Sequence, residues 1–315
     1  MMTNTKIEGL IAAAFCGLKE DGSINLDIIP ALAERLIRDG VKGVFVCGTN
    51  GEGPSLTIEE RMAIAETYVK AVNKRILVIV HVGHSSIEES AKLAAHAASI
   101  GADAISSVAA FYFKPANVQS LVHCMAKIAG AAPQLPFYYY HIPAITGISI
   151  DMLEFLRLSD DMIPNLAGIK YTAATIHEFQ SCLNYKNGKF DILYGYDELL
   201  LPALSVGAKG AIGSTYSFAA PLYLKVMELF AEGNIEAARA EQYKCVEMIR
   251  ILGKLSPIPT QKKILELAGL DLGPCRLPLV ELNEDETGLL RNYLTQIQFF
   301  EHLEKAREEI VAYHK

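Results

Sequence analysis

The chain has 315 residues, of which 51% are hydrophobic and 21% are charged, and its formal net charge is −7. This composition predicts a sizeable apolar core and excludes a disordered chain. The acidic balance argues against nucleic acid as the main partner, because phosphate binding needs basic patches. No apolar run approaches the roughly 18 residues that span a bilayer, so no membrane partner is expected.

The six cysteines are scattered along the chain, with no C-x-x-C pair. This spacing suits neither a zinc site nor a small disulfide scaffold, so the cysteines are interpreted as reduced packing residues. The N-terminus also lacks the charged start, apolar segment and cleavage site of a secretory signal. We therefore expect a cytoplasmic protein.

Short apolar runs alternate with amphipathic stretches along most of the chain. Strands are predicted at residues 9–15, 43–47, 76–82, 104–108, 137–140, 166–170, 191–194 and 210–212. Helical periodicity is present at residues 25–39, 58–72, 87–100, 118–128 and 150–158. Strands that alternate with helices imply right-handed βαβ units and a parallel sheet.

Eight strands in this pattern predict an α/β fold, the (β/α)8 TIM barrel, with a C-terminal helical extension. An open doubly wound sheet is the main competitor, but it usually has fewer strands per domain. We expect residues 1–222 to form the barrel core, up to the eighth strand and the start of its helix. Residues 223–315 are expected to form the last barrel helix and the extension, packed with the barrel as one structural unit.

Lys170 ends the sixth predicted strand, directly after the apolar run Leu-Ala-Gly-Ile. Lysine is rarely buried, because removing an ammonium group from water is costly. An apolar surround suppresses the charge, and the free amine can then form a Schiff base with a ketone. Alternatively, the side chain reaches the surface from the strand end and has no catalytic role.

The loops that follow the strands build the active site of a TIM barrel. The loop at residues 48–53, Gly-Thr-Asn-Gly-Glu-Gly, offers backbone N–H groups and two polar side chains to a carboxylate or phosphate, although it could be a plain turn. Its spacing matches neither the dinucleotide-binding nor the P-loop signature.

Three tyrosines end the fifth predicted strand. Tyr138 and Tyr140 share one face of that strand, and one of the two phenols could transfer a proton. Packing in the core is the alternative for both. Asp197, Glu198 and Ser214 follow the last two strands and suit a polyhydroxylated ligand, although the two carboxylates could simply stabilise a helix N-terminus.

Five short motifs occur together and in order. Through these motifs the sequence resembles the dihydrodipicolinate synthase/N-acetylneuraminate lyase superfamily of Schiff-base barrel enzymes, and in particular its lyase branch. The motifs are Gly-Thr-x-Gly-Glu at 48–52, Tyr-x-Ile-Pro-Ala at 140–144, Gly-Ile-Lys-x-Thr at 168–172, Gly-Tyr-Asp-Glu at 195–198 and Gly-Ser-Thr-Tyr at 213–216.

The resemblance implies a role for each matching residue. Lys170 would be the Schiff-base lysine and Tyr140 the phenol that transfers protons. Tyr112 would reach an active site across a subunit contact in a homotetramer. Thr49 and Asn50 would hold the substrate carboxylate. The sugar hydroxyls would be held by five further residues, Thr172, Gly195, Asp197, Glu198 and Ser214.

Two positions bear on the branch and on the substrate. The synthase branch has an arginine just after its Tyr-x-x-Pro segment, whereas residues 144–147 here are Ala-Ile-Thr-Gly, without a cation for a second carboxylate. Asn50 stands where the family usually has Ser or Thr, and its amide can still donate a hydrogen bond. The resemblance thus implies reversible cleavage of N-acetylneuraminate, a sialic acid, to N-acetylmannosamine and pyruvate, with no metal or organic cofactor.

Three other functions remain open. An aldolase that acts on a 2-keto-3-deoxy sugar acid would use the same lysine and tyrosine. His81 and His84 raise the possibility of a metal-dependent aldolase. Residues three apart on a strand face opposite sides, however, which argues against one metal site that uses both. A non-catalytic keto-acid sensor would need neither Lys170 nor Tyr140.

Overall fold

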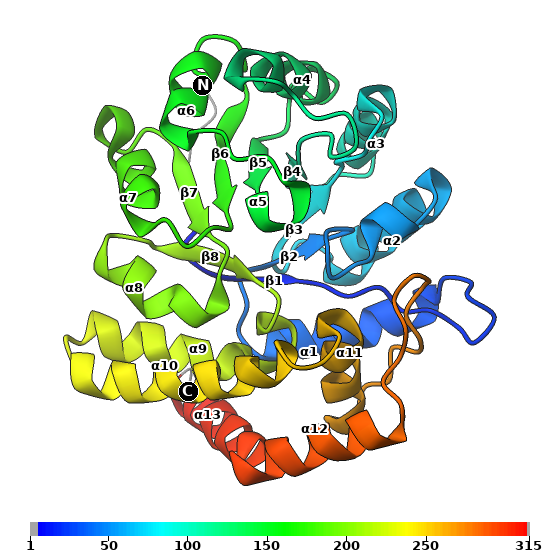
Figure 1. Cartoon of the computed structure of the whole chain (residues 1–315), viewed down its shortest axis with the longest axis vertical. Coiled ribbons are helices and arrows are strands. Elements are labelled where there is room, and N and C mark those ends of the chain that lie inside the picture. Colours follow the sequence, from blue (N-terminus) through cyan, green and yellow to red (C-terminus); the bar gives the residue numbers. More distant parts are fainter. Residues whose placement is uncertain (1–5, 314–315) are drawn as a thin grey trace.

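Eight parallel strands close into a barrel in the order of the sequence in the computed structural model, which describes residues 6–313 (Figure 1). The strands are β1 Gly9–Ala13, β2 Gly43–Val46, β3 Leu77–His81, β4 Ala104–Ser107, β5 Phe137–His141, β6 Leu166–Tyr171, β7 Asp191–Tyr194 and β8 Gly210–Gly213. Each coincides with a predicted strand, and only the ends differ. The predicted TIM barrel is therefore confirmed.

Helices surround the barrel in the spaces between successive strands (Figure 1). They are α1 Ile29–Arg38, α2 Ile58–Val72, α3 Ile87–Ser99, α4 Val118–Gly130, the short α5 Pro143–Thr146, α6 Met152–Ser159, α7 Ile176–Asn184, α8 Leu200–Ser205 and α9 Tyr216–Ala231. The sequence sets several of these starts. Thr57 and Glu60 form a capping box at the start of α2. Pro30 lies in the first turn of α1, where proline costs no hydrogen bond.

The C-terminal extension consists of helices, as predicted: α10 Ile235–Leu252, α11 Pro257–Leu267, α12 Glu284–Gln296 and α13 Phe299–Tyr313. Helix α9 packs against β1, α10 and α13, so it joins the extension to the barrel. The expected division after residue 222 falls inside α9.

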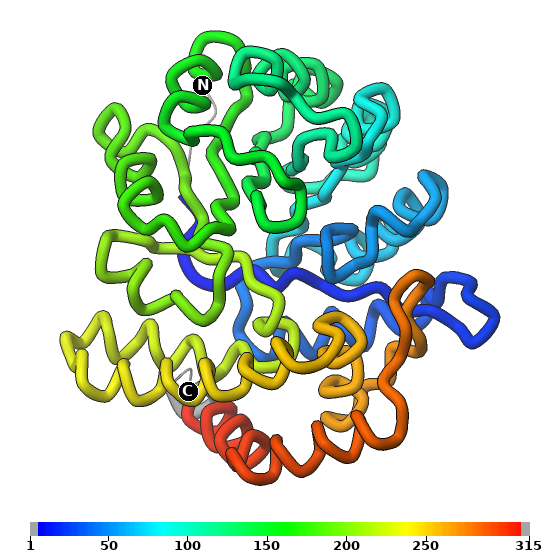
Figure 2. Tube along the Cα trace, in the orientation of Figure 1, coloured from blue at the N-terminus to red at the C-terminus, as the bar shows by residue number. Residues whose placement is uncertain are grey.

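The segment after α11 returns to the N-terminal part of the chain and lies beside it (Figure 2). The backbone N–H of Leu18 donates to the carbonyl of Leu272 at 2.9 Å, and the Arg276 guanidinium donates to the carbonyl of Gly22 at 2.6 Å.

Two apolar cores lie on the two sides of the strands. The larger lies between the strands and the helices, and the smaller fills the barrel interior. Tyr138 and Tyr140 belong to the interior and Tyr139 to the outer core, which confirms the predicted shared face. The interior core consists of Ile7, Ile11, Phe45, Ile79, Ala104, Val108, Tyr138, Tyr140, Ile142, Ala167, Leu193 and Ile212.

A shift in register between β5 and β6 decides where Lys170 points. Phe137 pairs with Leu166 but Tyr138 pairs with Gly168, so β6 has one extra residue at this place. Ala167 faces the interior, and strict alternation from it would turn Lys170 outward. The extra residue resets the alternation, as a bulge does, and Lys170 faces the interior beside Tyr140.

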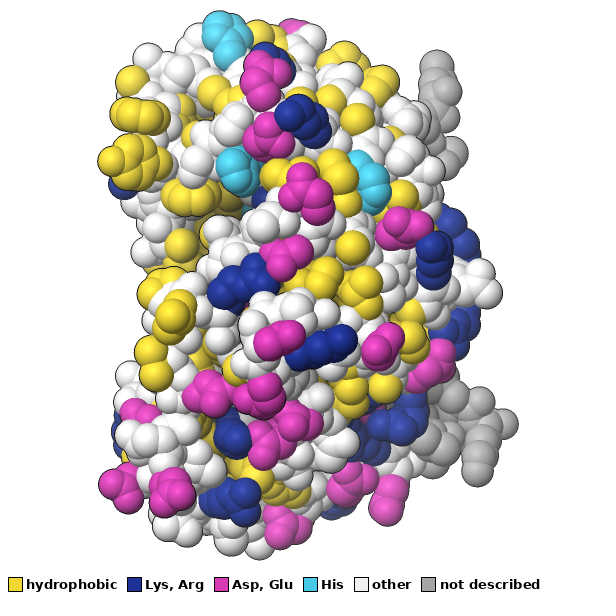
Figure 3. Space-filling model, turned by 90° about the vertical axis from the view of Figure 1, so that its right-hand side faces the viewer, with side chains coloured by type: hydrophobic (Ala, Val, Ile, Leu, Met, Phe, Trp, Pro, Cys, Tyr) yellow, Lys and Arg dark blue, Asp and Glu magenta, His cyan; other side chains and the backbone are white. Residues whose placement is uncertain are grey.

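On the face shown in Figure 3, acidic and basic side chains are interspersed. Within residues 6–313, no helix is long and apolar enough to cross a membrane. The six cysteines are free, and Cys16, Cys47, Cys182 and Cys245 are buried.

We predict that Gly168→Ala destabilises the fold by about 3 kcal/mol, the upper part of the range for overpacked sites. A Cβ atom there would lie 1.6 Å from the backbone oxygen of Asp191, so β6 and β7 would have to separate. The free energy of urea unfolding measures the effect. Gly288→Ala is the control, because it has no neighbour within 4 Å and lies in α12, where alanine stabilises by up to about 1 kcal/mol. Equal stability of the two variants would contradict the prediction.

Candidate active site

A cavity of ≈ 530 Å³ opens at the carboxyl ends of the strands, the end at which TIM barrels hold their active sites. It brings together most of the residues that the sequence singled out. Those that line it are Thr49, Asn50, Tyr140, Lys170, Thr172, Gly195, Asp197, Glu198 and Ser214. Tyr112 is the exception.

Lys170 is buried at the floor of this cavity, with 3% of its surface exposed. Its Nζ lies 4.1 Å from the ring centroid of Phe45 and 4.0 Å from that of Tyr140. Burial lowers the pKa of the Lys170 amine to about 7, and the Asp197 carboxylate partly opposes this change. A large fraction of the amine is therefore neutral near pH 7, and a neutral amine is nucleophilic.

Tyr140 lies directly beside the amine, because Tyr140 and Lys170 are paired across β5 and β6. Its hydroxyl is 3.5 Å from the Thr49 hydroxyl. Burial raises the pKa of Tyr140 to about 12, although the hydrogen bond with Thr49 lowers it in part. The phenol therefore stays protonated at neutral pH, and it can accept a proton only while it passes one on.

The loop after β2 makes an unusually tight turn. Cys47 and Glu52 adopt left-handed φ angles of 59° and 52°. A Cβ atom at Gly53 would lie 2.1 Å from the Cys47 carbonyl oxygen, so this position requires glycine. Among residues 6–313, the backbone N–H groups of Thr49, Asn50 and Gly51 have no hydrogen-bond partner. Successive free N–H groups in a turn can bind an anion together, as a nest.

The Asn50 side chain is buried and has its own backbone partners. Its amide nitrogen donates to the carbonyl of Ala13 at 3.2 Å and to that of Ser214 at 3.5 Å. Both amide hydrogens are thereby engaged, and the side chain joins the loop to the ends of β1 and β8. The donors that this loop leaves open to a carboxylate are its backbone N–H groups and the half-buried Thr49.

Asp197 forms the centre of a polar network on the other side of the cavity. Its Oδ2 accepts hydrogen bonds from the Thr215 N–H at 2.8 Å, the Thr215 hydroxyl at 2.6 Å and the Ser214 hydroxyl at 3.3 Å. Burial raises the pKa of Asp197 to about 6, and the bonds from Thr215 oppose this rise. Glu198, next to it, is half-buried at the same cavity.

Two buried polar atoms in this network have no protein partner. Within the described part of the chain, Asp197 Oδ1 and Thr172 Oγ1 make no hydrogen bond. Neighbouring glycines make room for both, because a Cβ atom at Gly213 would lie 1.9 Å from Asp197 Oδ1 and one at Gly195 would lie 1.9 Å from Thr172 Oγ1. Buried polar groups are normally satisfied, so these atoms indicate a place for a polar ligand.

Sequence analysis missed a whole wall of the cavity. Helices α10 and α11 and their connection supply Ile249, Arg250, Leu252, Gly253, Pro257, Ile258 and Gln261, and the barrel adds Ala13, Ile142, Ile145, Tyr196 and Ile212. No local motif marks these positions, because apolar residues of amphipathic helices predict packing alone.

Tyr112, His81 and His84 do not line the cavity, but the His81 ring packs edge-to-face against the Tyr140 ring, with 5.8 Å between the centroids. Tyr112 is 78% exposed and packs edge-to-face against Phe113. His81 uses both ring nitrogens, at 3.1 Å from the Cys47 carbonyl and 3.4 Å from the Val108 N–H, whereas His84 accepts from Ser86. The described residues contain no group of three His, Cys, Asp or Glu side chains that could hold a metal ion.

Known proteins are similar to this chain in sequence and in fold. The model of the dihydrodipicolinate synthetase family matches residues 6–297. N-acetylneuraminate lyase of Xenopus tropicalis is 43% identical over 279 residues, which cover 87% of this chain and 91% of the relative. The Rattus norvegicus enzyme of the same name is 38% identical over 299 residues, 93% of each chain.

Solved structures give the same result. The structure of Proteus mirabilis N-acetylneuraminate lyase superposes with a TM-score of 0.91 at 38% identity, covering 94% of this chain and 100% of that one. The sialic acid aldolase of Aliivibrio salmonicida also has a TM-score of 0.91, at 40% identity, covering 94% of this chain and 98% of its own. The chain belongs to the dihydrodipicolinate synthetase family.

Proposed function

We propose that this protein is a Schiff-base aldolase that cleaves N-acetylneuraminate reversibly to N-acetylmannosamine and pyruvate. The observation that carries the proposal is the amine of Lys170, buried between two aromatic rings with a pKa of about 7. The names of relatives at 38–43% identity support the choice of substrate.

In the first step the open-chain substrate places its carboxylate in the loop after β2. The free N–H groups of Thr49, Asn50 and Gly51 donate to the carboxylate, which brings the adjacent ketone to Lys170. The neutral amine attacks the ketone carbon, water leaves, and a protonated imine forms. Its positive nitrogen then serves as the electron sink.

In the second step the bond between the third and fourth carbons breaks. Tyr140 takes the proton from the fourth-carbon hydroxyl while its own proton passes to the substrate carboxylate, and the Thr49 hydroxyl lies 3.5 Å from its phenol. The bonding electrons move to the imine, which leaves a pyruvate enamine and releases N-acetylmannosamine as an aldehyde. Protonation of the enamine carbon and hydrolysis of the imine then free pyruvate.

The sugar part of the substrate lies against the network around Asp197. The unpartnered Oδ1 of Asp197 accepts hydrogen bonds from sugar hydroxyls, and the Thr172 hydroxyl donates to them or accepts from them. Glu198 and Ser214 line the same side of the cavity. Pro143–Thr146 forms the short helix α5 at the rim, and this segment has no cation that would favour a second carboxylate on the substrate.

The proposal includes a homotetramer in the cytoplasm. Tyr112 and Phe113 are 78% and 86% exposed on the loop after β4, and two neighbouring aromatic rings of this kind are typical of a subunit contact. The six scattered cysteines fit a reducing compartment, where thiols stay free.

Lys170→Ala is expected to lower pyruvate release from N-acetylneuraminate by at least about 10³-fold, because the covalent intermediate cannot form. Borohydride with pyruvate should add mass to the wild type and not to the variant. Lys209→Ala, at an exposed lysine, serves as the control and should behave as wild type. Faster release from a six-carbon 2-keto-3-deoxy acid would move the enzyme to another aldolase branch, and activity that survives in Lys170→Ala would overturn the mechanism.

Tyr140→Phe should separate bond cleavage from imine formation. We expect kcat to fall by about 10²- to 10⁴-fold, as for the loss of a general acid–base group. Trapping with pyruvate and borohydride should persist, since the Lys170 amine remains. A variant with wild-type kcat would remove Tyr140 from the proton transfer.

The pH dependence of kcat/KM should follow the protonation of the Lys170 amine. Below pH 7 the amine is protonated and unreactive, so kcat/KM should rise with pH and level off above about 7. The Asp197 carboxylate raises the pKa of the Lys170 amine, so Asp197→Asn should move this limb to lower pH. Glu198→Gln is the matched control and should leave the limb in place. Measured pH profiles of kcat/KM for the three proteins decide, and equal profiles would contradict the assignment.

A further inference from the structure

The loop at residues 48–53, which is proposed to bind the substrate carboxylate, contains a buried carboxylate of its own. The negative charge of this side chain would oppose the binding of an anion. The Glu52 side chain has no exposed surface, and its backbone has the left-handed φ of 52°. Only a few side chains tolerate this conformation, and it persists where surrounding contacts hold it. Glu52 is also joined to the site, because its N–H donates to the Thr49 carbonyl at 3.1 Å.

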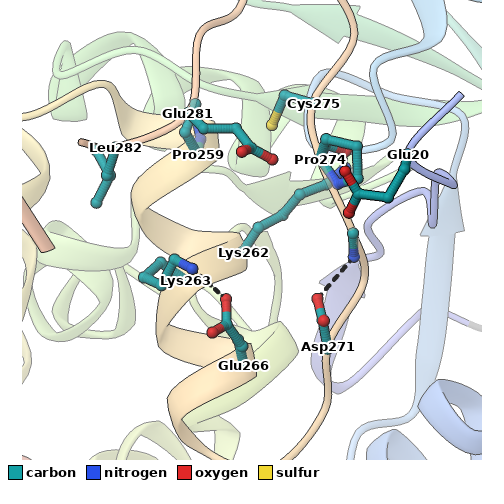
Figure 4. A pocket seen from close by; sticks show the side chains of 11 residues that line it. Glu20, Pro259, Lys262, Lys263, Glu266, Asp271, Pro274, Cys275, Glu281 and Leu282 are labelled. Atoms are coloured by element: carbon teal, nitrogen blue, oxygen red, sulfur yellow. Dashed lines mark hydrogen bonds and ion pairs between the residues drawn. The ribbon is translucent and has the colours of Figure 1, made fainter. Parts of the chain in front are cut away.

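The contacts that hold Glu52 come from the C-terminal extension. Lys262 of α11 lies 2.7 Å from Glu52 Oε1, and it donates to the carbonyl of Pro274 at 2.7 Å. Figure 4 shows the Lys262 side chain reaching from its helix toward Pro274, away from Lys263 and Glu266, which pair with each other. Lys262 is 5% exposed, so this is a buried ion pair.

A second contact holds the other carboxylate oxygen. The backbone N–H of Arg276 donates to Glu52 Oε2 at 2.7 Å. The Arg276 guanidinium binds both oxygens of Glu60, at 2.6 and 2.8 Å, and the carbonyl of Ser55 at 3.1 Å. Arg276 therefore contacts the segment from Ser55 to Glu60, which follows the loop. Both Glu52 oxygens lie against residues of the extension, Oε1 against Lys262 and Oε2 against Arg276.

If the loop binds an anion, the charge of Glu52 has to be neutralised, and Lys262 lies where it can do so. A buried carboxylate in the same loop as a bound carboxylate would repel it, because like charges interact strongly away from water. The Lys262 ammonium neutralises Glu52 where solvent cannot. The neighbouring residue on α11, Gln261, lines the catalytic cavity, so one turn of this helix contributes to the cavity wall and to the loop behind it.

We propose that Lys262 is a positioning residue for the carboxylate of the keto-acid substrate. Through its ion pair with Glu52 it holds the nest at Thr49, Asn50 and Gly51 in shape and cancels the charge behind it. This inference rests on the proposed function and goes beyond it, because it makes the affinity for the keto acid depend on the C-terminal extension. Lys262 touches no reacting atom in this role.

The test compares two ketones of similar size, pyruvate and acetone, of which only pyruvate has a carboxylate. Half-saturation is measured for each by trapping on Lys170 with borohydride, together with KM and kcat for cleavage of N-acetylneuraminate. The variants are Lys262→Met and the double variant Glu52→Gln with Lys262→Met. The double variant leaves no unpaired buried charge, so it decides the question if the single one does not fold. Lys263→Met is the matched control at the adjacent surface lysine.

The half-saturation concentration of pyruvate should rise by about 10- to 100-fold in Lys262→Met, the effect of a misplaced binding group, and KM should rise with it. The rise should be smaller in the double variant, which also loses the ion pair but has no buried charge to repel the substrate. The value for acetone and kcat should change by less than about threefold, and Lys263→Met should equal wild type. A folded double variant with unchanged pyruvate affinity would overturn the inference. So would an equal change for both ketones, since that indicates a general structural role. If pyruvate does not label the wild type, the proposed function fails, and this inference fails with it.

Discussion

The burial of the Lys170 amine between the rings of Phe45 and Tyr140 is the interaction on which the rest of the site depends. A charged ammonium is unfavourable in this apolar interior, so the pKa falls to about 7. The same burial raises the pKa of Tyr140 to about 12, which keeps its phenol protonated. One apolar environment thus leaves the Lys170 amine largely deprotonated and the Tyr140 phenol protonated, as their proposed roles require.

The polar groups of the cavity are arranged around this apolar floor without disturbing it. Asp197 turns one oxygen toward Thr215 and Ser214, and its remaining charge lifts the pKa of Lys170 only in part. The loop after β2, which is proposed to bind the substrate carboxylate, offers backbone N–H groups, which carry no net charge. A cationic side chain beside Lys170 would lower the pKa of its amine further, whereas a nest holds an anion with dipoles alone.

The C-terminal extension forms part of the cavity and contacts the loop after β2. Helices α10 and α11 form one wall of the cavity. Lys262 forms an ion pair with Glu52 in the loop after β2, and the backbone N–H of Arg276 donates a hydrogen bond to the same carboxylate. A buried charge of this kind is strongly destabilising when its partner is lost. The barrel and its extension therefore depend on each other at the point where the substrate carboxylate is proposed to bind.

The sequence by itself determined the eight strands, five of the helices between them and the end of the barrel at which the site lies. It did not predict α5, α7 and α8, which are short. Period-two and period-3.6 patterns report local burial, and each loop follows its strand directly. It also marked Lys170, Tyr140 and Asp197, because short motifs surround them. Only the tertiary structure decided that Lys170 points inward, since this depends on the register shift between β5 and β6. The same holds for the engaged amide of Asn50 and for Lys262 behind Glu52, because their partners lie 37, 164 and 210 residues away and no local pattern records such pairs.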